Sequence, residues 1–220
     1  MAGQHHMGDG DIRVAETRHD TGISPFDRFS DADVRALIAD YPLAWVCGGT
    51  GAAIEASLLP LVGVYDDSGR LIELIGHLMR SNPLHALLAG RPDATILFRG
   101  PAAYISPEHA GRRDWAPTWN YAQLKIAARI AFDDALTEHA LALLIDAVEN
   151  GRAAPWRVEE LGPRYHAMLP HIIGFRARVT DLSGKFKLGQ DEKPSTFAAI
   201  TATLPDVETV AWMRRMNGER

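Results

Sequence analysis

The chain has 220 residues, of which 46% are hydrophobic and 23% are charged, the balance of a globular protein with one sizeable core. This composition excludes disordered, collagen-like and disulfide-scaffold chains, and no apolar run is long enough to span a membrane. The net charge of −5 argues against nucleic-acid binding driven by overall charge, and the single cysteine, Cys47, fits a reducing, cytoplasmic setting. Residues 1–23 lack hydrophobic periodicity and an apolar signal core, so we expect a flexible N-terminal arm.

The first half of the chain predicts a helix and then a meander of strands. Ser30 and Asp33 form a capping-box-like pair, and the apolar positions that follow recur at helical spacing up to Pro42. Strands are expected over Leu43–Cys47, Ala53–Tyr65 and Leu71–Gly76. Glycines separate the first two strands, and Asp66–Gly69 predicts a hairpin loop.

The second half alternates helices with strands. Asn82 and Pro83 predict a helix start, a cap residue followed by proline at the first helical position. Strands are expected over Ala94–Phe98 and Tyr121–Phe132, and as a pair over His171–Leu188 with a turn at Ser183–Gly184. A helix is expected over Thr137–Asn150, with an apolar stripe of Leu141, Leu144, Ile145 and Val148, and further helix from Pro194. The order indicates an α+β fold with an antiparallel barrel.

Several common site motifs are incomplete or absent in this sequence. Gly49-Thr-Gly51 follows a strand, but Ile54 replaces the third glycine of a dinucleotide fingerprint, so a glycine hairpin is the better interpretation. The chain has no Walker loop, no nucleophile elbow and no His-Glu-x-x-His motif. The histidines lack ligand spacing, so no metal site is expected. Cys47 lies in an apolar strand, and we interpret it as a buried small residue.

Three segments carry candidate binding chemistry. Arg80, Ser81 and Asn82 lie between a strand and a helix N-terminus, where a guanidinium, a hydroxyl, an amide and free backbone N–H groups suit a phosphate monoester; an ordinary capped helix is the alternative. Pro117–Tyr121 places two aromatics around an amide, which suits a planar heterocycle or simple core packing. Lys185 and Lys187 share one strand face and suit a phosphate, a flavin carbonyl, nucleic acid or solvent.

Together these segments resemble the PaiB-type FMN-binding negative transcriptional regulators, which belong to the flavin-binding split barrels with pyridoxamine 5′-phosphate oxidase. The resemblance runs from about Phe26 to about Gln190. We therefore divide the chain into the arm (1–23), a split-barrel domain (24–192) and a C-terminal helical extension (193–220). The residues that carry the resemblance are Phe26–Phe29, Tyr41–Leu43, Gly76–His77, Asn82–Pro83, Gly100–Pro101, Ala103–Ser106, Pro117–Tyr121, Ile173–Phe175, Lys187–Leu188 and Gln190.

The resemblance implies a six-stranded antiparallel split barrel with peripheral helices, a homodimer, and FMN at the dimer interface. It assigns the phosphate to Arg80, Ser81 and Asn82, and it implies that the strand Glu55–Leu59 runs along the isoalloxazine. The full set of implied cofactor-binding residues is Glu55, Ala56, Ser57, Leu58, His77, Arg80, Ser81, Asn82, Trp119, Asn120, Gln123, Lys185, Lys187 and Gln190. Of these, Trp119, Asn120 and Gln123 are expected from the partner subunit.

Ser57, His109 and Lys125 stand where the family pattern has other residues, around the expected pocket. Three functional hypotheses follow. The first is an FMN-dependent oxidoreductase or flavin reductase that uses a small-molecule electron donor, with no catalytic residue assigned. The second is a PaiB-like regulator that binds DNA through basic strips at Arg176, Arg178, Lys185 and Lys187 and at Arg214–Arg215. The third is a haem or small-ligand binding module with His77, His85, His109 or His171 as iron ligand.

Overall fold

Six antiparallel strands close into a barrel in the order β1-β2-β3-β6-β5-β4. The computed structural model describes residues 24–51 and 53–218, so the expected N-terminal arm lies outside the described residues. The α+β fold with a six-stranded antiparallel barrel is confirmed. The strands are β1 (Leu43–Gly48), β2 (Glu55–Tyr65), β3 (Leu71–Met79), β4 (Asp93–Ile105), β5 (Thr118–Asp133) and β6 (Ile172–Lys187).

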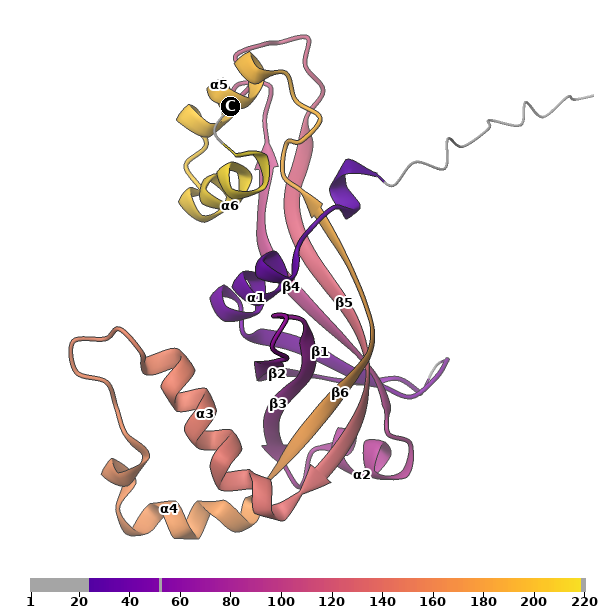
Figure 1. Cartoon of the computed structure of the whole chain (residues 1–220), viewed down its shortest axis with the longest axis vertical. Helices are drawn as coiled ribbons and strands as arrows, with labels where there is room; N and C mark the ends of the chain where they lie inside the picture. Colours follow the sequence, from indigo (N-terminus) through magenta and orange to yellow (C-terminus); the bar gives the residue numbers. More distant parts are fainter. Residues whose placement is uncertain (1–23, 52, 219–220) are drawn as a thin grey trace, which may run out of the picture.

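Helices surround this barrel at its side and at both ends (Figure 1). The α-helices are α1 (Asp31–Asp40), α2 (Pro83–Gly90), α3 (Thr137–Glu149), α4 (Pro163–Met168), α5 (Pro194–Thr203) and α6 (Val207–Asn217). Short 3-10 turns are η1 (Pro25–Asp27), η2 (Asp134–Leu136), η3 (Val158–Leu161) and η4 (Leu169–His171). The segment from α3 to α4 projects from the lower end of the barrel, and we call it the α3–α4 hairpin. Helices α5 and α6 lie at the opposite end, beside the long strands β4 and β5.

The core follows from strand alternation. In β5, every second residue from Ala122 to Ile130 is buried while its neighbours are more exposed, because successive side chains point to opposite faces of a strand. Phe98, Phe175 and Phe186 fill the barrel. Buried residues of α5 and α6 belong to the same cluster: Phe197, Ile200, Val210, Trp212 and Met213. The C-terminal helices therefore complete the core at their end of the barrel.

Local signals in the sequence form as predicted. Ser30 Oγ accepts from Asp33 N at 3.2 Å, and the Asp33 carboxylate accepts from Ser30 N at 2.9 Å, which is the expected capping box. The turn between β2 and β3 closes with a 2.9 Å bond from Gly69 N to the Asp66 carbonyl, and Gly69 adopts φ +88°, a conformation that glycine reaches at little cost.

The predicted turn at Ser183–Gly184 was wrong, because β6 runs unbroken through both residues and pairs Ser183 with Lys125 and Gly184 with Leu124. A Cβ on Gly184 would lie 3.0 Å from both Leu124 Cδ2 and Phe29 Cε1. This glycine therefore provides close packing inside a strand.

The predicted core stripe of α3 was also wrong. Leu141, Leu144 and Ile145 are only half-buried and Val148 is exposed. Instead, Ala140 and Leu143 pack with Leu136 against Ile75 of β3. The apolar face of α3 is broad, and periodicity alone does not say which part of it the sheet covers.

Candidate functional site

The loop between β3 and α2 forms the first part of the candidate site. Asn82 is the N-cap of α2, and its Oδ1 accepts from Leu84 N at 3.0 Å, as its sequence position predicted. Helix α2 packs closely on the end of the barrel: a Cβ on Gly48 would lie 2.7 Å from Leu87 Cδ2. The N-terminus of α2 is thereby fixed beside the exposed Ser81, and a helix N-terminus favours an anion.

Ser57 and Asn82 meet across this loop. Asn82 Nδ2 donates to Ser57 Oγ at 2.9 Å, and the two side chains come from β2 and from the start of α2. Both are half-buried. We call Ser57, Arg80, Ser81 and Asn82 the phosphate corner, because it combines a guanidinium, two hydroxyls and an amide at one helix start.

The guanidinium of Arg80 is bonded on two sides. Its Nε donates to the Pro170 carbonyl at 3.1 Å, and its Nη2 donates to the Asp134 carboxylate. The Arg80 backbone N–H donates to the His171 carbonyl at 2.9 Å. Arg80 therefore ties the phosphate corner to η2 and η4, which flank the α3–α4 hairpin.

His77 lies next to this corner, on β3 opposite Gly174 of β6. Among the described residues, its Nδ1 has no hydrogen-bond partner. Burial lowers the pKa of this imidazole from its ordinary value, because the charged form loses solvation. His77 is thus held mainly neutral near neutral pH.

The expected ring-contacting strand splits between two faces. Successive side chains of β2 point to opposite faces: Ala56 and Leu58 are exposed, whereas the Ser57 side chain bonds to Asn82. Cys47 is half-buried, and burial raises the pKa of its thiol, so the cysteine that was predicted to be buried lies at the edge of the core.

An exposed apolar surface continues from Leu58. Trp45 pairs with Leu58 on one side and with Leu97 of β4 on the other. These three side chains and Leu43 are 39–48% exposed. We call Leu43, Trp45, Leu58 and Leu97 the apolar patch, and a contiguous exposed apolar surface of this kind marks an interaction site.

Trp119 and Asn120 lie at the α5–α6 end of β5 and point in opposite directions. Trp119 is 55% exposed and packs at 5.8 Å between ring centroids against Tyr104 of β4. Asn120 is buried, and its Nδ2 donates to Met213 Sδ of α6 at 3.4 Å. Of this predicted pair, Trp119 faces outward.

Gln123 is exposed beside Lys185 of β6 in the same ladder. Lys185 Nζ is 3.0 Å from Asp27 Oδ1, and Lys187 Nζ contacts the Thr118 hydroxyl. Gln190 folds back on its own segment, with Nε2 donating to the Phe186 carbonyl at 2.6 Å. The lysines share an outer face as predicted, with Phe186 buried on the other.

Two groups of the predicted site residues, at Arg80 and at Trp119, thus lie at opposite ends of one strand. Arg80 contacts Asp134, the residue directly after β5, whereas Trp119 is the second residue of β5. The 14 residue-to-residue steps from Trp119 to Asp133 correspond to about 45 Å of strand. Figure 1 shows β5 running between the two ends of the molecule. One bound FMN cannot contact both groups of the same chain.

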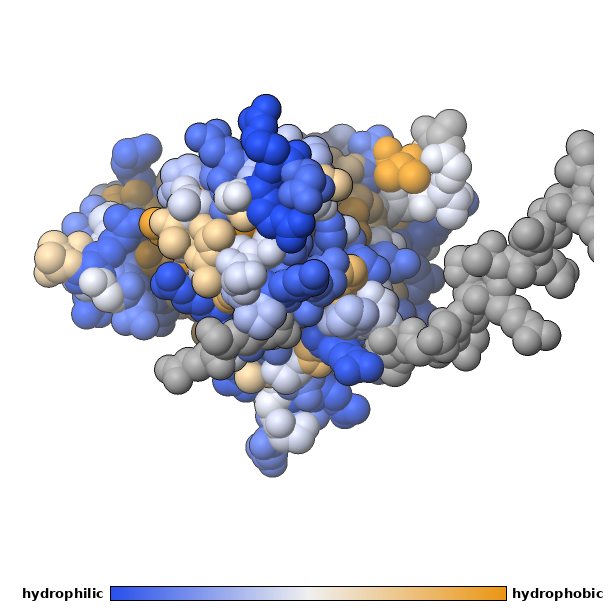
Figure 2. Space-filling view, turned by 90° about the horizontal axis from the view of Figure 1, so that it is seen from above, coloured by the Kyte–Doolittle hydropathy of each residue, from blue (hydrophilic) through white to orange (hydrophobic). Residues whose placement is uncertain are grey.

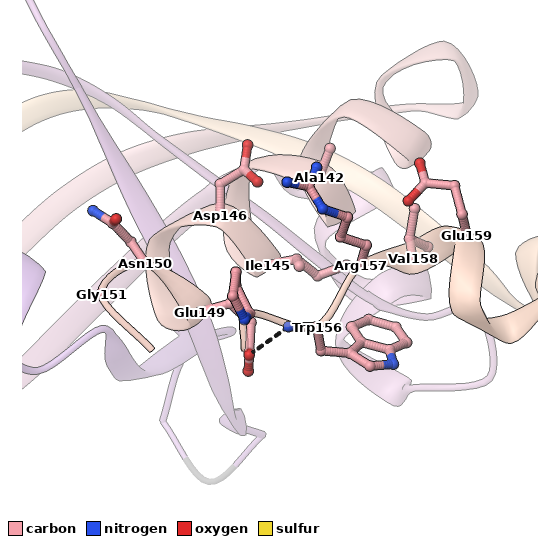
Figure 3. Close-up of a pocket in the computed structure, with 11 residues that line it drawn as sticks. Ala142, Ile145, Asp146, Glu149, Asn150, Gly151, Trp156, Arg157, Val158 and Glu159 are labelled. Carbon is pink, nitrogen blue, oxygen red and sulfur yellow. Dashed lines mark hydrogen bonds between the residues drawn. The ribbon is translucent and has the colours of Figure 1, made fainter. Parts of the chain in front are cut away.

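A hollow lies in the α3–α4 hairpin, between α3 and residues 155–159 (Figure 3). It has a volume of about 530 Å³, and the carboxylates of Asp146, Glu149 and Glu159 lie around it. Glu149 Oε2 accepts from Trp156 N at 2.9 Å. Three carboxylates beside Arg157 disfavour a phosphate, so we do not assign the flavin to this hollow.

Sequence reasoning missed the partners of Arg80. Asp134 and Pro170 are 54 and 90 residues away along the chain, and no local pattern pointed to them. Among the described residues, the structure brings together no metal-binding cluster of His, Cys, Asp or Glu side chains. Within the same residues, every helix is too short or too polar to cross a membrane.

Comparison with known proteins agrees with this architecture. Residues 24–181 match the family described as "Putative FMN-binding domain". The chain is 28% identical over 138 residues to protease synthase and sporulation protein PAI 2 of Bacillus subtilis, covering 61% of this chain and 66% of that protein. It is 27% identical over 203 residues to an uncharacterized protein of Emericella nidulans, covering 72% and 79% of the two chains.

Among solved structures, the fold is similar to that of an FAD and haem binding protein from Mycobacterium smegmatis. The TM-score is 0.54 at 18% identity, covering 78% of each chain. The matched segment 24–181 spans the barrel from before α1 to within β6. The PaiB-type resemblance and the split-barrel fold are confirmed, and the chain belongs to this FMN-binding domain family, with FMN as its cofactor.

Proposed function

We propose that this protein is a homodimeric flavoprotein, with FMN bound between two chains, that acts as a flavin-dependent oxidoreductase or flavin reductase. The observation that carries the proposal is the separation of the two groups of site residues along β5. Arg80 and Trp119 lie at opposite ends of the strand, so an FMN that contacts both needs two copies of the chain.

The phosphate corner fits the phosphate of FMN. It offers the Ser81 hydroxyl, the Arg80 guanidinium and the N-terminus of α2 in one place, which is the donor set that a phosphate monoester requires. We assign the phosphate to Arg80 and Ser81, with Ser57 and Asn82 holding the loop between them in shape. Glu55 and His77 lie on the strands that flank this corner.

The flavin ring extends, in this proposal, along Ala56 and Leu58 towards the partner's copy of β5. Trp119 provides an exposed aromatic surface there, and Gln123, Lys185 and Lys187 provide polar groups on the same outer side of the sheet. Asn120 and Gln190 support this surface from behind, through α6 and the β6 backbone. Bound FMN supplies the electron-transfer chemistry, and the protein supplies orientation and electrostatics.

The apolar patch supports the dimer. Trp45, Leu58 and Leu97 are adjacent in the barrel ladder and exposed in the single chain, and burying them against a second copy removes apolar surface from water. By contrast, Figure 2 shows a mainly hydrophilic surface when the molecule is viewed from above.

The charge distribution favours the flavin over DNA. Arg176 is 3.1 Å from Glu73, Lys185 is 3.0 Å from Asp27, and Arg215 is 2.8 Å from Asp33. Each of these cations belongs to a basic strip that a DNA-binding function would use. Because a neighbouring carboxylate offsets each of these three cations, the net attraction of the strips to DNA phosphates is weakened.

The visible spectrum of the purified protein, recorded after FMN addition and desalting, tests the proposal. We expect a retained flavin band, and a dimer by analytical ultracentrifugation. A dimer that retains no flavin contradicts the flavin assignment, and a Soret band on haem addition would favour a haem module instead. A screen of reduced nicotinamide donors then tests the oxidoreductase activity.

A further inference from the structure

The carboxylate of Asp134 contacts the guanidinium of Arg80, the group that we assign to the FMN phosphate. The Asp134 carboxylate accepts from Arg80 Nη2, while Arg80 Nε is occupied by the Pro170 carbonyl at 3.1 Å. A guanidinium has five N–H donors in a fixed fork. The carboxylate therefore takes one of the terminal donors that a phosphate monoester would otherwise use.

The two contacts of Arg80 differ in how easily they exchange. The Nε bond goes to a backbone carbonyl in η4, and the Arg80 backbone also donates to the His171 carbonyl at 2.9 Å, so this side of the residue is anchored. The Asp134 side chain is 78% exposed and the Arg80 side chain is 35% exposed. An ion pair this exposed contributes little stability and is readily displaced by a more highly charged anion.

We propose that Asp134 is a gate residue of the FMN phosphate site: it neutralises Arg80 when no phosphate is bound, and the phosphate of FMN displaces it. This inference rests on the proposed function and adds a specificity determinant to the same site. Ligands without a phosphate, such as riboflavin, do not compete for Arg80 and leave Asp134 in place. The carboxylate therefore lowers the affinity for phosphorylated ligands alone.

The Asp134→Asn variant tests the gate. The substitution keeps the shape of the side chain and removes its charge. The neighbouring cap, in which Ala135 N donates to Asp133 Oδ1 at 2.9 Å, is unchanged. The dissociation constants of FMN and of riboflavin are measured by quenching of flavin fluorescence at low salt. We expect Asp134→Asn to bind FMN about three- to fivefold more tightly, the upper part of the range of an exposed ion pair, with riboflavin affinity unchanged.

Asp93→Asn is the matched control, because Asp93 is also highly exposed and lies 4.0 Å from an arginine, Arg129, on the barrel surface. It should bind both flavins like the wild type. Unchanged or weaker FMN binding by Asp134→Asn, while Arg80→Ala still weakens FMN binding, overturns the gate and leaves the phosphate corner standing. If Arg80→Ala also binds FMN normally, the phosphate corner itself is wrong and the gate is wrong with it.

Discussion

Asn82 Nδ2 donates to Ser57 Oγ at 2.9 Å while Asn82 Oδ1 caps the N-terminus of α2 through Leu84 N at 3.0 Å. One amide side chain thus joins the start of β2 to the start of α2. Ser57 stands where we noted a departure from the family pattern, and the structure uses it to hold the phosphate corner together.

The first prediction concerns this amide. Asn82→Ala removes the cap of α2 and the bond to Ser57, and it should lower the free energy of unfolding by about 1–2 kcal/mol, measured by urea denaturation. Asn82→Asp keeps the cap and should stay close to wild-type stability. Because its carboxylate repels a phosphate, it should nevertheless weaken FMN binding, and equal FMN affinity in Asn82→Asp and wild type argues against a phosphate at this helix start.

The second prediction concerns Arg80. Arg80→Ala should weaken FMN binding by roughly 1.5–3 kcal/mol, the range of a hydrogen bond to a charged group, and should leave riboflavin binding unchanged. Isothermal titration with both flavins measures the difference. An equal loss for FMN and riboflavin would place Arg80 near the ring instead of the phosphate.

The third prediction concerns Trp119. Trp119→Ala should weaken FMN and riboflavin equally, by about 1–3 kcal/mol, the range measured for stacking of a planar base on an aromatic side chain. Trp156→Ala is the control, since Trp156 is also exposed, at 36%, but lies in the α3–α4 hairpin. Weaker binding of FMN alone, or an equal effect of Trp156→Ala, contradicts a ring contact at Trp119.

The fourth prediction concerns the apolar patch. Leu58→Lys places a charge in this patch beside Trp45, where burial against a second copy would desolvate it. The variant should be monomeric, or weakly dimeric, by analytical ultracentrifugation, and should lose FMN at the same time. Ile72→Lys is the control, because Ile72 is 37% exposed on β3, outside the patch. A fully dimeric Leu58→Lys variant excludes this surface as the interface.

The fifth prediction concerns pH. The pKa of His77 in the folded chain lies below the ordinary value of 6.5, so the unfolded chain takes up the proton first as the pH falls. His77 therefore lowers stability progressively from pH 6.5 downwards and has little effect well above it. Urea denaturation between pH 5 and about pH 8 should show a flatter pH dependence for His77→Gln. The same substitution at the exposed His139 controls for the change of side-chain type.

The sequence predicted the features whose causes are local. The capping box of Ser30 and Asp33, the start of α2 at Asn82–Pro83 and the turn at Asp66–Gly69 each depend on residues within a few positions of one another. All three form as predicted. The order of helices and strands also indicated an antiparallel barrel, whereas its six strands and its cofactor were expected from the family resemblance.

Features set by distant packing were beyond a single sequence. Gly184 was interpreted as part of a turn. The residues that pack against it, Leu124 and Phe29, are distant in the chain and meet it only in the folded barrel. The apolar stripe of α3 was misplaced because β3 covers Ala140 instead of Leu144. The contact between Arg80 and Asp134 likewise depends on distant pairing, because β6 pairs with both β3 and β5 and brings the ends of these two strands near one another.

Complementation between two variants tests whether each FMN site is shared by two chains. Arg80→Ala and Trp119→Ala are co-expressed with different tags, and the hybrid dimer is isolated by sequential affinity steps. Flavin titration is then compared with both parent homodimers. We expect the hybrid to have one FMN site of wild-type affinity, because its intact Arg80 and intact Trp119 meet across the interface. A hybrid whose sites are all as weak as those of the parents would show that each site is built within one chain.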